Sequence, residues 1–175
     1  MKYLRNRLVF VMLALSITLA QAQTMKQYES AGDGFRVSWP GEPTVQKNTV
    51  PTDKGPFELR TYLVEVGETA LYVGVCDYGS AVNDRSPDAI LQGAEKGALD
   101  NVKAHIIGEH KLITLQGNKG LEFIAENDTM HFTMRIYFVA GRNTLYQTLT
   151  AAPINNQYAG AFAFMDSFEL ARRTQ

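Results

Sequence analysis

Cysteine is nearly absent from this chain of 175 residues, because Cys76 is the only one. The chain therefore cannot form an intramolecular disulfide. Residues 72–75, which precede Cys76, form a strand-like and apolar segment, and the residue after Cys76 is the acidic Asp77. A reactive thiol needs a neighbouring cation to lower its pKa. We therefore predict that Cys76 is a buried and inert thiol.

The sequence also lacks the local signatures of common catalytic and metal sites. It contains no Gly-x-Ser-x-Gly, phosphate-loop, paired-cysteine or HExxH pattern. His105, Glu109 and His110 come nearest to a metal-binding cluster, but in an extended segment the first two stand roughly 13 Å apart. We predict that these residues are solvated and that the protein has no metal, no cofactor and no enzymatic activity. Scattered acids still leave a carboxylate-pair glycosidase open.

Basic runs are missing as well, apart from three basic residues close to the N-terminus. Those three are among 17 basic residues in total, against 18 acidic ones. Without them the chain carries a net charge of about −4, whereas nucleic-acid and anionic-membrane binders usually carry basic patches. We therefore expect no nucleic-acid partner.

The first 22 residues have the pattern of a secretory signal peptide. Lys2, Arg5 and Arg7 precede an apolar run over 8–15, and Ala20-Gln21-Ala22 is a small-x-small cleavage pattern. We predict cleavage before Gln23, export to the periplasm or the extracellular space, and no stable membrane insertion afterwards. The apolar run is short for a bilayer span, although an uncleaved anchor is the alternative.

Alternating apolar and polar residues predict strands along most of the remaining chain. Ser86-Pro87-Asp88 has the chemistry of a helix start, and apolar residues at helical spacing follow it, which predicts a helix over 87–103. A second apolar stripe after Pro153 predicts a terminal helix. The strands are expected over residues 35–39, 44–50, 57–66, 70–78, 106–115, 121–126, 130–140 and 143–151. The stripe of the terminal helix comprises Ile154, Tyr158, Ala161, Phe162, Met165 and Phe168.

This order of elements predicts the α+β class, with one mainly antiparallel sheet of about 6–8 strands and two principal helices packed on it. We see neither an internal repeat nor a low-complexity linker. The expected organisation is a signal peptide over 1–22, a flexible lead-in over 23–33 and a single domain over 34–171.

The layout resembles the PsbP/Mog1-like superfamily, an α/β/α sandwich built on an antiparallel sheet. The resemblance rests on the opening over 34–43 (GFRVSWPGEP), on a strand pair followed by a helix and a meander, and on the close over 164–168 (FMDSF). It implies a binding or accessory module, and it supplies no shared catalytic set. Many bacterial envelope members are lipoproteins, whereas this chain has no cysteine at the predicted cleavage site.

One face of the predicted sheet mixes aromatic and charged residues. In the strand over 130–139, Arg135 and Tyr137 alternate with an apolar series and therefore leave the apolar face. The candidate binding residues on the mixed face are Arg60, Tyr62, Arg135, Tyr137 and Tyr146, joined by Tyr72 and Tyr78 if the register permits. Tyr and Arg are enriched at interaction hot spots. The alternative is cross-strand packing on a half-exposed sheet.

Two functions follow from these observations. The first is a secreted or periplasmic, non-catalytic accessory module that recognises a protein or an envelope component through the mixed face. The second is a hydrolase or small-ligand carrier whose site is assembled by loops. A closed pocket with several titratable groups favours the second, and an open aromatic patch favours the first.

Overall fold

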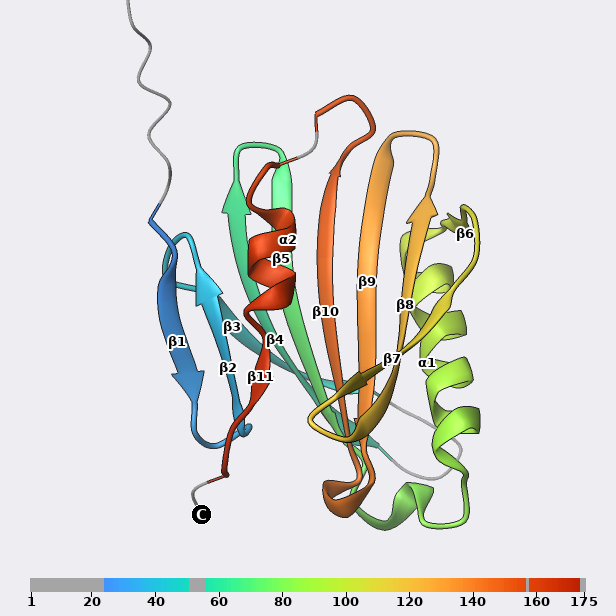
Figure 1. The fold of residues 1–175 in the computed structure, drawn as a ribbon. Helices are drawn as coiled ribbons and strands as arrows, with labels where there is room; N and C mark the ends of the chain where they lie inside the picture. Colours follow the sequence, from blue (N-terminus) through green and yellow to red (C-terminus); the bar gives the residue numbers. More distant parts are fainter. Residues whose placement is uncertain (1–23, 51–55, 157, 174–175) are drawn as a thin grey trace, which may run out of the picture.

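The computed structural model describes residues 24–50, 56–156 and 158–173. Within these ranges the chain is mainly β, with eleven strands, one long helix and one short helix (Figure 1). The strands are β1 (Lys26–Ser30), β2 (Phe35–Trp39), β3 (Thr44–Val50), β4 (Phe57–Val66), β5 (Thr69–Asp77), β6 (His105–Ile106), β7 (Lys111–Leu115), β8 (Asn118–Glu126), β9 (Met130–Val139), β10 (Thr144–Pro153) and β11 (Glu169–Leu170). The helices are α1 (Pro87–Val102) and α2 (Ala161–Asp166), and two 3-10 turns lie at Gly79–Val82 and Ala140–Arg142.

The strands form two antiparallel sheets. The large sheet has the order β3-β4-β5-β10-β9-β8-β6, and β7 pairs with β8 beside β6. The small sheet has the order β1-β2-β11 and joins the first described strand to the last. Figure 1 shows the small sheet and α2 against one face of the large sheet, and α1 against the other.

Helix α1 confirms the predicted helix over 87–103. The Ser86 hydroxyl accepts a hydrogen bond from the Ala89 N–H at 3.2 Å, which satisfies one of the free donors of the first turn. The helix ends at Lys103, whose left-handed backbone (φ 51°) stops it. Ile90 and Leu91 point into the core shared with β8 and β9.

Each face of the large sheet packs into its own core, because side chains alternate along a strand. Met134, Ile136 and Phe138 of β9 pack beneath α1. Tyr137 and Val139 pack toward the small sheet, where they meet Phe35 and the other buried residues of that core. The small sheet and α2 therefore supply the layer that a second long helix was expected to supply.

The predicted α+β sandwich with two principal helices is wrong. Helix α2 has only six residues, and Gly160 precedes it. Two members of the expected apolar stripe are on the outside, since Ile154 is 39% exposed and Phe162 is 60% exposed. Phe168 is buried as expected, but it lies beyond the helix, next to β11. Most of the segment after Pro153 thus lacks a continuous helical apolar face.

Lys26–Ser30, which lies within the predicted lead-in over 23–33, forms β1 and pairs with β2 along its whole length. Local composition suggested loose order because β1 is polar on one side, whereas its pairing with β2 supplies the backbone hydrogen bonds. The strand predicted over 106–115 is also divided, into β6 and β7. Residues 1–22, with the predicted signal peptide, lie outside the described residues.

In the described part of the chain, neither α1 nor α2 has the length and apolar character that a membrane-spanning helix requires.

Candidate functional site: a groove between β7 and α2

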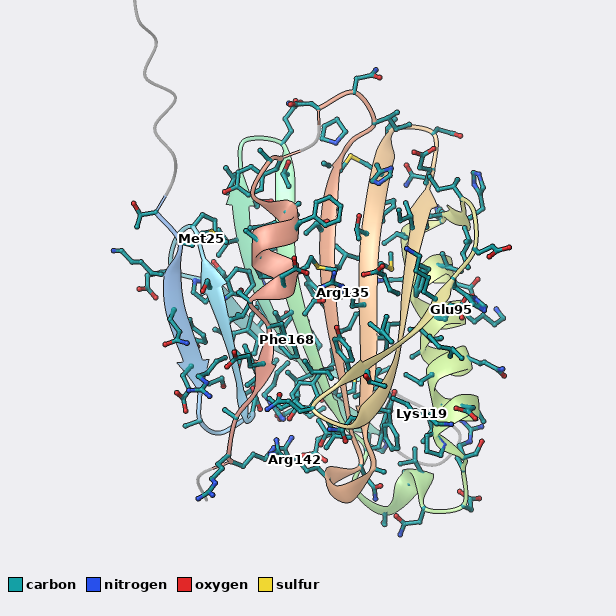
Figure 2. All side chains as sticks on the ribbon, in the orientation of Figure 1. Met25, Glu95, Lys119, Arg135, Arg142 and Phe168 are labelled. Carbon is teal, nitrogen blue, oxygen red and sulfur yellow. The ribbon has the colours of Figure 1, made fainter. Side chains whose placement is uncertain are left out.

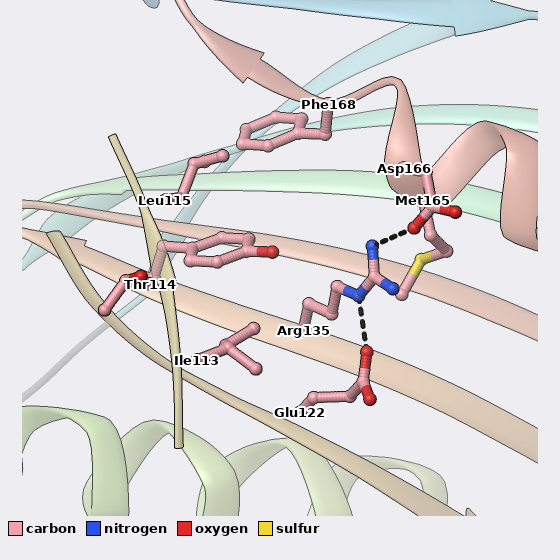
Figure 3. Close-up of a pocket in the computed structure, with 9 residues that line it drawn as sticks. Ile113, Thr114, Leu115, Glu122, Arg135, Met165, Asp166 and Phe168 are labelled. Atoms are coloured by element: carbon pink, nitrogen blue, oxygen red, sulfur yellow. Dashed lines mark hydrogen bonds and ion pairs between the residues drawn. The ribbon is translucent and has the colours of Figure 1, made fainter. Parts of the chain in front are cut away.

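A groove of about 260 Å³ opens on the face of the large sheet that also carries the small sheet. Strand β7 forms one wall, α2 and the residues after it form the other, and β8 and β9 form the floor (Figure 3). The lining residues are Ile113, Thr114, Leu115, Glu122, Arg135, Tyr137, Met165, Asp166 and Phe168. Figure 2 places Arg135 and Phe168 near the middle of the molecule.

The floor of the groove is built by close packing around Tyr137. A Cβ atom added to Gly120, on the neighbouring strand, would lie 2.6 Å from Tyr137 Cδ1 and 2.6 Å from the Ile136 carbonyl oxygen. Gly120 therefore lets the Tyr137 ring lie against the sheet. On its other side the ring stacks on Phe168, with centroids 6.0 Å apart and planes within 5°. The two rings give this end of the groove a rigid apolar surface.

Arg135 is the charged centre of the groove. Its Nε donates to Glu122 Oε2 and its Nη1 donates to Asp166 Oδ1, each at 2.7 Å. Burial works against the charge of Arg135, but the two carboxylates raise its pKa above the ordinary value. The guanidinium side chain is 16% exposed, whereas Asp166 is 64% exposed. The groove thus holds a fixed cation on its floor and an accessible anion on its α2 wall.

Gln116 follows β7 and binds the backbone of β11. Its side-chain amide donates to the Leu170 carbonyl at 3.1 Å, and its oxygen accepts from the Leu170 N–H at 2.6 Å. These two hydrogen bonds tie the end of β7 to β11, although the two strands belong to different sheets. The backbone of Gln116 is left-handed (φ 48°), and Gly117 follows it in the β7–β8 turn.

The structure divides the predicted binding residues between two places. Arg135 and Tyr137 line the groove. Arg60, Tyr62 and Tyr146 belong instead to a polar network around the buried Asp33, between β4, β10 and the β1–β2 turn.

Asp33 organises that network through both its carboxylate and its backbone. Arg60 Nε donates to one carboxylate oxygen and the Tyr62 hydroxyl donates to the other. The Tyr146 hydroxyl donates to the Asp33 carbonyl at 2.6 Å. Burial and the adjacent carboxylate raise the pKa of Tyr62. These contacts fasten the β1–β2 turn onto the large sheet.

Two further arginines, Arg142 in the turn between β9 and β10 and Arg173 after β11, extend the same network. Arg142 Nη2 donates to the Ala171 carbonyl at 2.8 Å, and Arg173 Nη1 donates to Asp77 Oδ2 at 2.9 Å. Figure 2 shows Arg142 at the lower end of the molecule. The network therefore holds both the first and the last described segments in place.

The mixed face is closed over at the three predicted tyrosines. Tyr62 is 4% exposed, Tyr137 is 5% exposed and Tyr146 is fully buried. The small sheet and Phe168 cover them, so their ring faces contact this chain's own aromatic residues. Arg60 is also mostly enclosed, with 15% of its side chain exposed. Cross-strand and inter-sheet packing, the alternative interpretation, accounts for these residues.

Sequence reasoning missed the other half of the groove. Glu122 alternates with Leu121 and Phe123, so its departure from the apolar core could have been inferred, but its pairing with Arg135 depends on the β8–β9 register. Asp166 and Met165 lie in the segment after Pro153, for which a longer helix was predicted. Their place opposite β7 depends on the small sheet, which periodicity does not predict.

In the described part of the chain, no group of three potential metal ligands is found among histidine, cysteine and acidic residues. His110 Nδ1 lies 3.2 Å from Glu95 Oε1, and His131 Nδ1 lies 2.9 Å from Glu126 Oε1. Burial raises the pKa of Cys76 to about 12, which keeps the thiol protonated at neutral pH.

Comparison with known proteins finds no family model that matches this chain and no significant match among curated proteins.

Proposed function

We propose that this chain is an exported, non-catalytic binding module that recognises a protein or an envelope component through the groove between β7 and α2. The observation that carries the proposal is the groove itself. It combines apolar walls from Leu115, Met165 and Phe168 with the fixed charges of Arg135 and Asp166. Apolar contact area around a few oriented polar groups is the usual composition of a recognition site.

The dimensions of the groove favour a partner that lies across it over a small molecule enclosed within it. Pockets that enclose drug-sized ligands usually measure about 300–1,000 Å³, and this groove is smaller, at about 260 Å³. A carrier would surround its ligand, whereas this groove is open to solvent.

The engagement of the charged side chains supports a binding role over catalysis. Both carboxylates of the groove accept hydrogen bonds from the same guanidinium, so Glu122 and Asp166 act as a clamp on Arg135. A glycosidase of the carboxylate-pair type needs one of its two acids to donate a proton to the leaving group, whereas both acids of this groove accept hydrogen bonds from Arg135. This binding role is also the one implied by the resemblance to PsbP/Mog1-like proteins.

A pair of matched tryptophan substitutions tests the proposed site. Thr114 lines the groove and Thr49 lies on β3, at the opposite edge of the large sheet, and both are exposed. Thr114→Trp adds a bulky side chain at the β7 wall of the groove, whereas Thr49→Trp adds the same side chain at the opposite edge of the sheet. We expect an envelope extract of the native host to yield a partner with the parent protein and Thr49→Trp, and not with Thr114→Trp.

The same experiment has two outcomes that contradict the proposal. Recovery of the same partner by all three proteins would remove the groove from the recognition surface. Turnover of ester, peptide or glycoside substrates by the parent protein, lost in Thr114→Trp, would replace the binding module with the loop-built hydrolase.

A further inference from the structure

We propose that the occupant of the groove is an extended polypeptide segment that adds to β7 as a new strand. This inference rests on the proposed function and specifies its partner. It follows from the free edge of β7, the hydrogen bonds of Gln116 and the charges along the groove.

Strand β7 has a free outer edge. It pairs with β8 on one side, and no described strand pairs with it on the other. In an antiparallel pair, alternate residues direct their N–H and C=O groups away from the partner strand. The Leu115 carbonyl already accepts a hydrogen bond from Asn118 at 3.2 Å, so the open stretch is Lys111–Thr114. This stretch has no proline, and Leu112 is 82% exposed. Another extended backbone would satisfy these groups.

Gln116 already makes hydrogen bonds of the kind that an added strand would make. Its amide donates to and accepts from the backbone of Leu170, as a peptide group of a neighbouring strand does. The opposite edge of β11 pairs with β2, so this contact is on the outer edge of the small sheet. Figure 1 shows β7 running across the face of β8 and β9 toward β11. An inserted segment would continue this pairing along the groove.

Side chains of the inserted segment would alternate between solvent and the groove. The groove offers them Ile113, Met165 and Phe168, which favour apolar residues at every second position. The two carboxylates of the groove differ in how many cations they already contact. Glu122 is shared by Arg135 and by Lys111, whose Nζ lies 3.9 Å away, whereas Arg135 is the one described ion-pair partner of the exposed Asp166. Asp166 therefore favours one basic residue in the segment.

A synthetic peptide tests this inference without knowledge of the native partner. The probe has nine residues, with threonine and valine alternating and arginine at the centre, and the control peptide has glutamate at the centre. Isotope-labelled full-length mature protein is titrated with each peptide and followed by NMR. We expect slower amide hydrogen exchange at alternate residues within Lys111–Thr114, and binding of the arginine peptide that is tighter by about tenfold.

N-methylated peptides and one protein variant separate the contribution of backbone pairing to binding from the contribution of charge. N-methylation of the peptide at every second residue should weaken binding by about tenfold or more, while methylation at the intervening residues should leave it nearly unchanged. This alternation is specific to a strand edge, and the modified peptides leave the protein fold intact. Asp166→Asn should remove the preference for arginine over glutamate and keep the alternation.

The outcomes distinguish this inference from the proposed function. Strand addition would be overturned if the peptide bound in the groove but N-methylation weakened binding equally at all positions, or if hydrogen exchange of the β7 amides did not slow. The groove would then remain a recognition site. The same holds if neither peptide binds but Thr114→Trp still abolishes capture of the native partner. Concentration-dependent dimers with protected β7 amides would identify a second copy of this chain as the occupant and would also overturn the inference.

Discussion

Replacement of Phe168 by alanine should be among the most destabilising single changes in this protein. Phe168 is 3% exposed and packs against three other rings, with centroid distances of 5.7 Å to Phe35, 6.0 Å to Tyr137 and 5.9 Å to Tyr146. It therefore joins the small sheet to the floor of the groove and to β10. Truncation of a buried phenylalanine to alanine costs about 3–5 kcal/mol in the free energy of unfolding, because a cavity remains.

Phe162 provides a matched control from the same segment. It lies on α2, six residues earlier, and is 60% exposed. Phe162→Ala should change the free energy of unfolding by no more than about 0.5 kcal/mol. Both aromatics belong to one helical stripe in the sequence, so the contrast between the two variants tests the observed arrangement against the predicted terminal helix.

The single tryptophan makes the measurement direct. Trp39 is 1% exposed and its ring lies 4.7 Å from that of Phe164, so its fluorescence reports on the layer that Phe168 holds in place. In urea unfolding, Phe168→Ala should lower the midpoint with an unchanged slope, and its melting temperature should fall by roughly 6–20 °C. Equal losses in the two phenylalanine variants would refute the reasoning.

Three other predictions follow from burial and from the sequence. Cys76 should alkylate slowly in the folded protein and rapidly in denaturant. Folding raises the pKa of Cys76 from 9.0 to about 12, so its contribution to stability is complete below pH 9 and declines as the pH rises toward 12. Thermal melts at alkaline pH should therefore show a smaller loss of stability in Cys76→Ala than in the parent protein. Tyr62→Phe removes one hydrogen-bond donor from the buried Asp33 and should cost about 1–3 kcal/mol, measured by urea unfolding. The exported protein should begin at Gln23, and an intact mass that includes residues 1–22 would refute signal cleavage.

Local chemistry was sufficient to predict α1 and most of the large sheet. The Ser86-Pro87-Asp88 start acts within one turn of the helix, so no distant contact is needed to place it. Alternation in β9 likewise separated Arg135 and Tyr137 from the residues that pack beneath α1, because the period of a strand is independent of its partners.

Long-range pairing explains what the sequence did not predict. Strand β11 has two residues, too few for a periodic signal, and it pairs with β2 more than 130 residues earlier in the chain. That pairing covers the tyrosines of the mixed face, and the groove described above lies beside Arg135. Tyr137 and Tyr146 are paired neighbours on β9 and β10, whereas Arg60 lies on β4, beyond β5. Only the register and the strand order separate these residues into two sites.

Photo-crosslinking in the native host tests most directly whether the groove is the recognition site. A photoreactive residue would replace Thr114 in one protein and Thr49 in the other, so that each exposed edge of the large sheet is sampled in the presence of every envelope component. A partner that crosslinks from position 114 and not from position 49 is the predicted result. Crosslinking from position 49 alone, or equally from both positions, would contradict recognition through the groove.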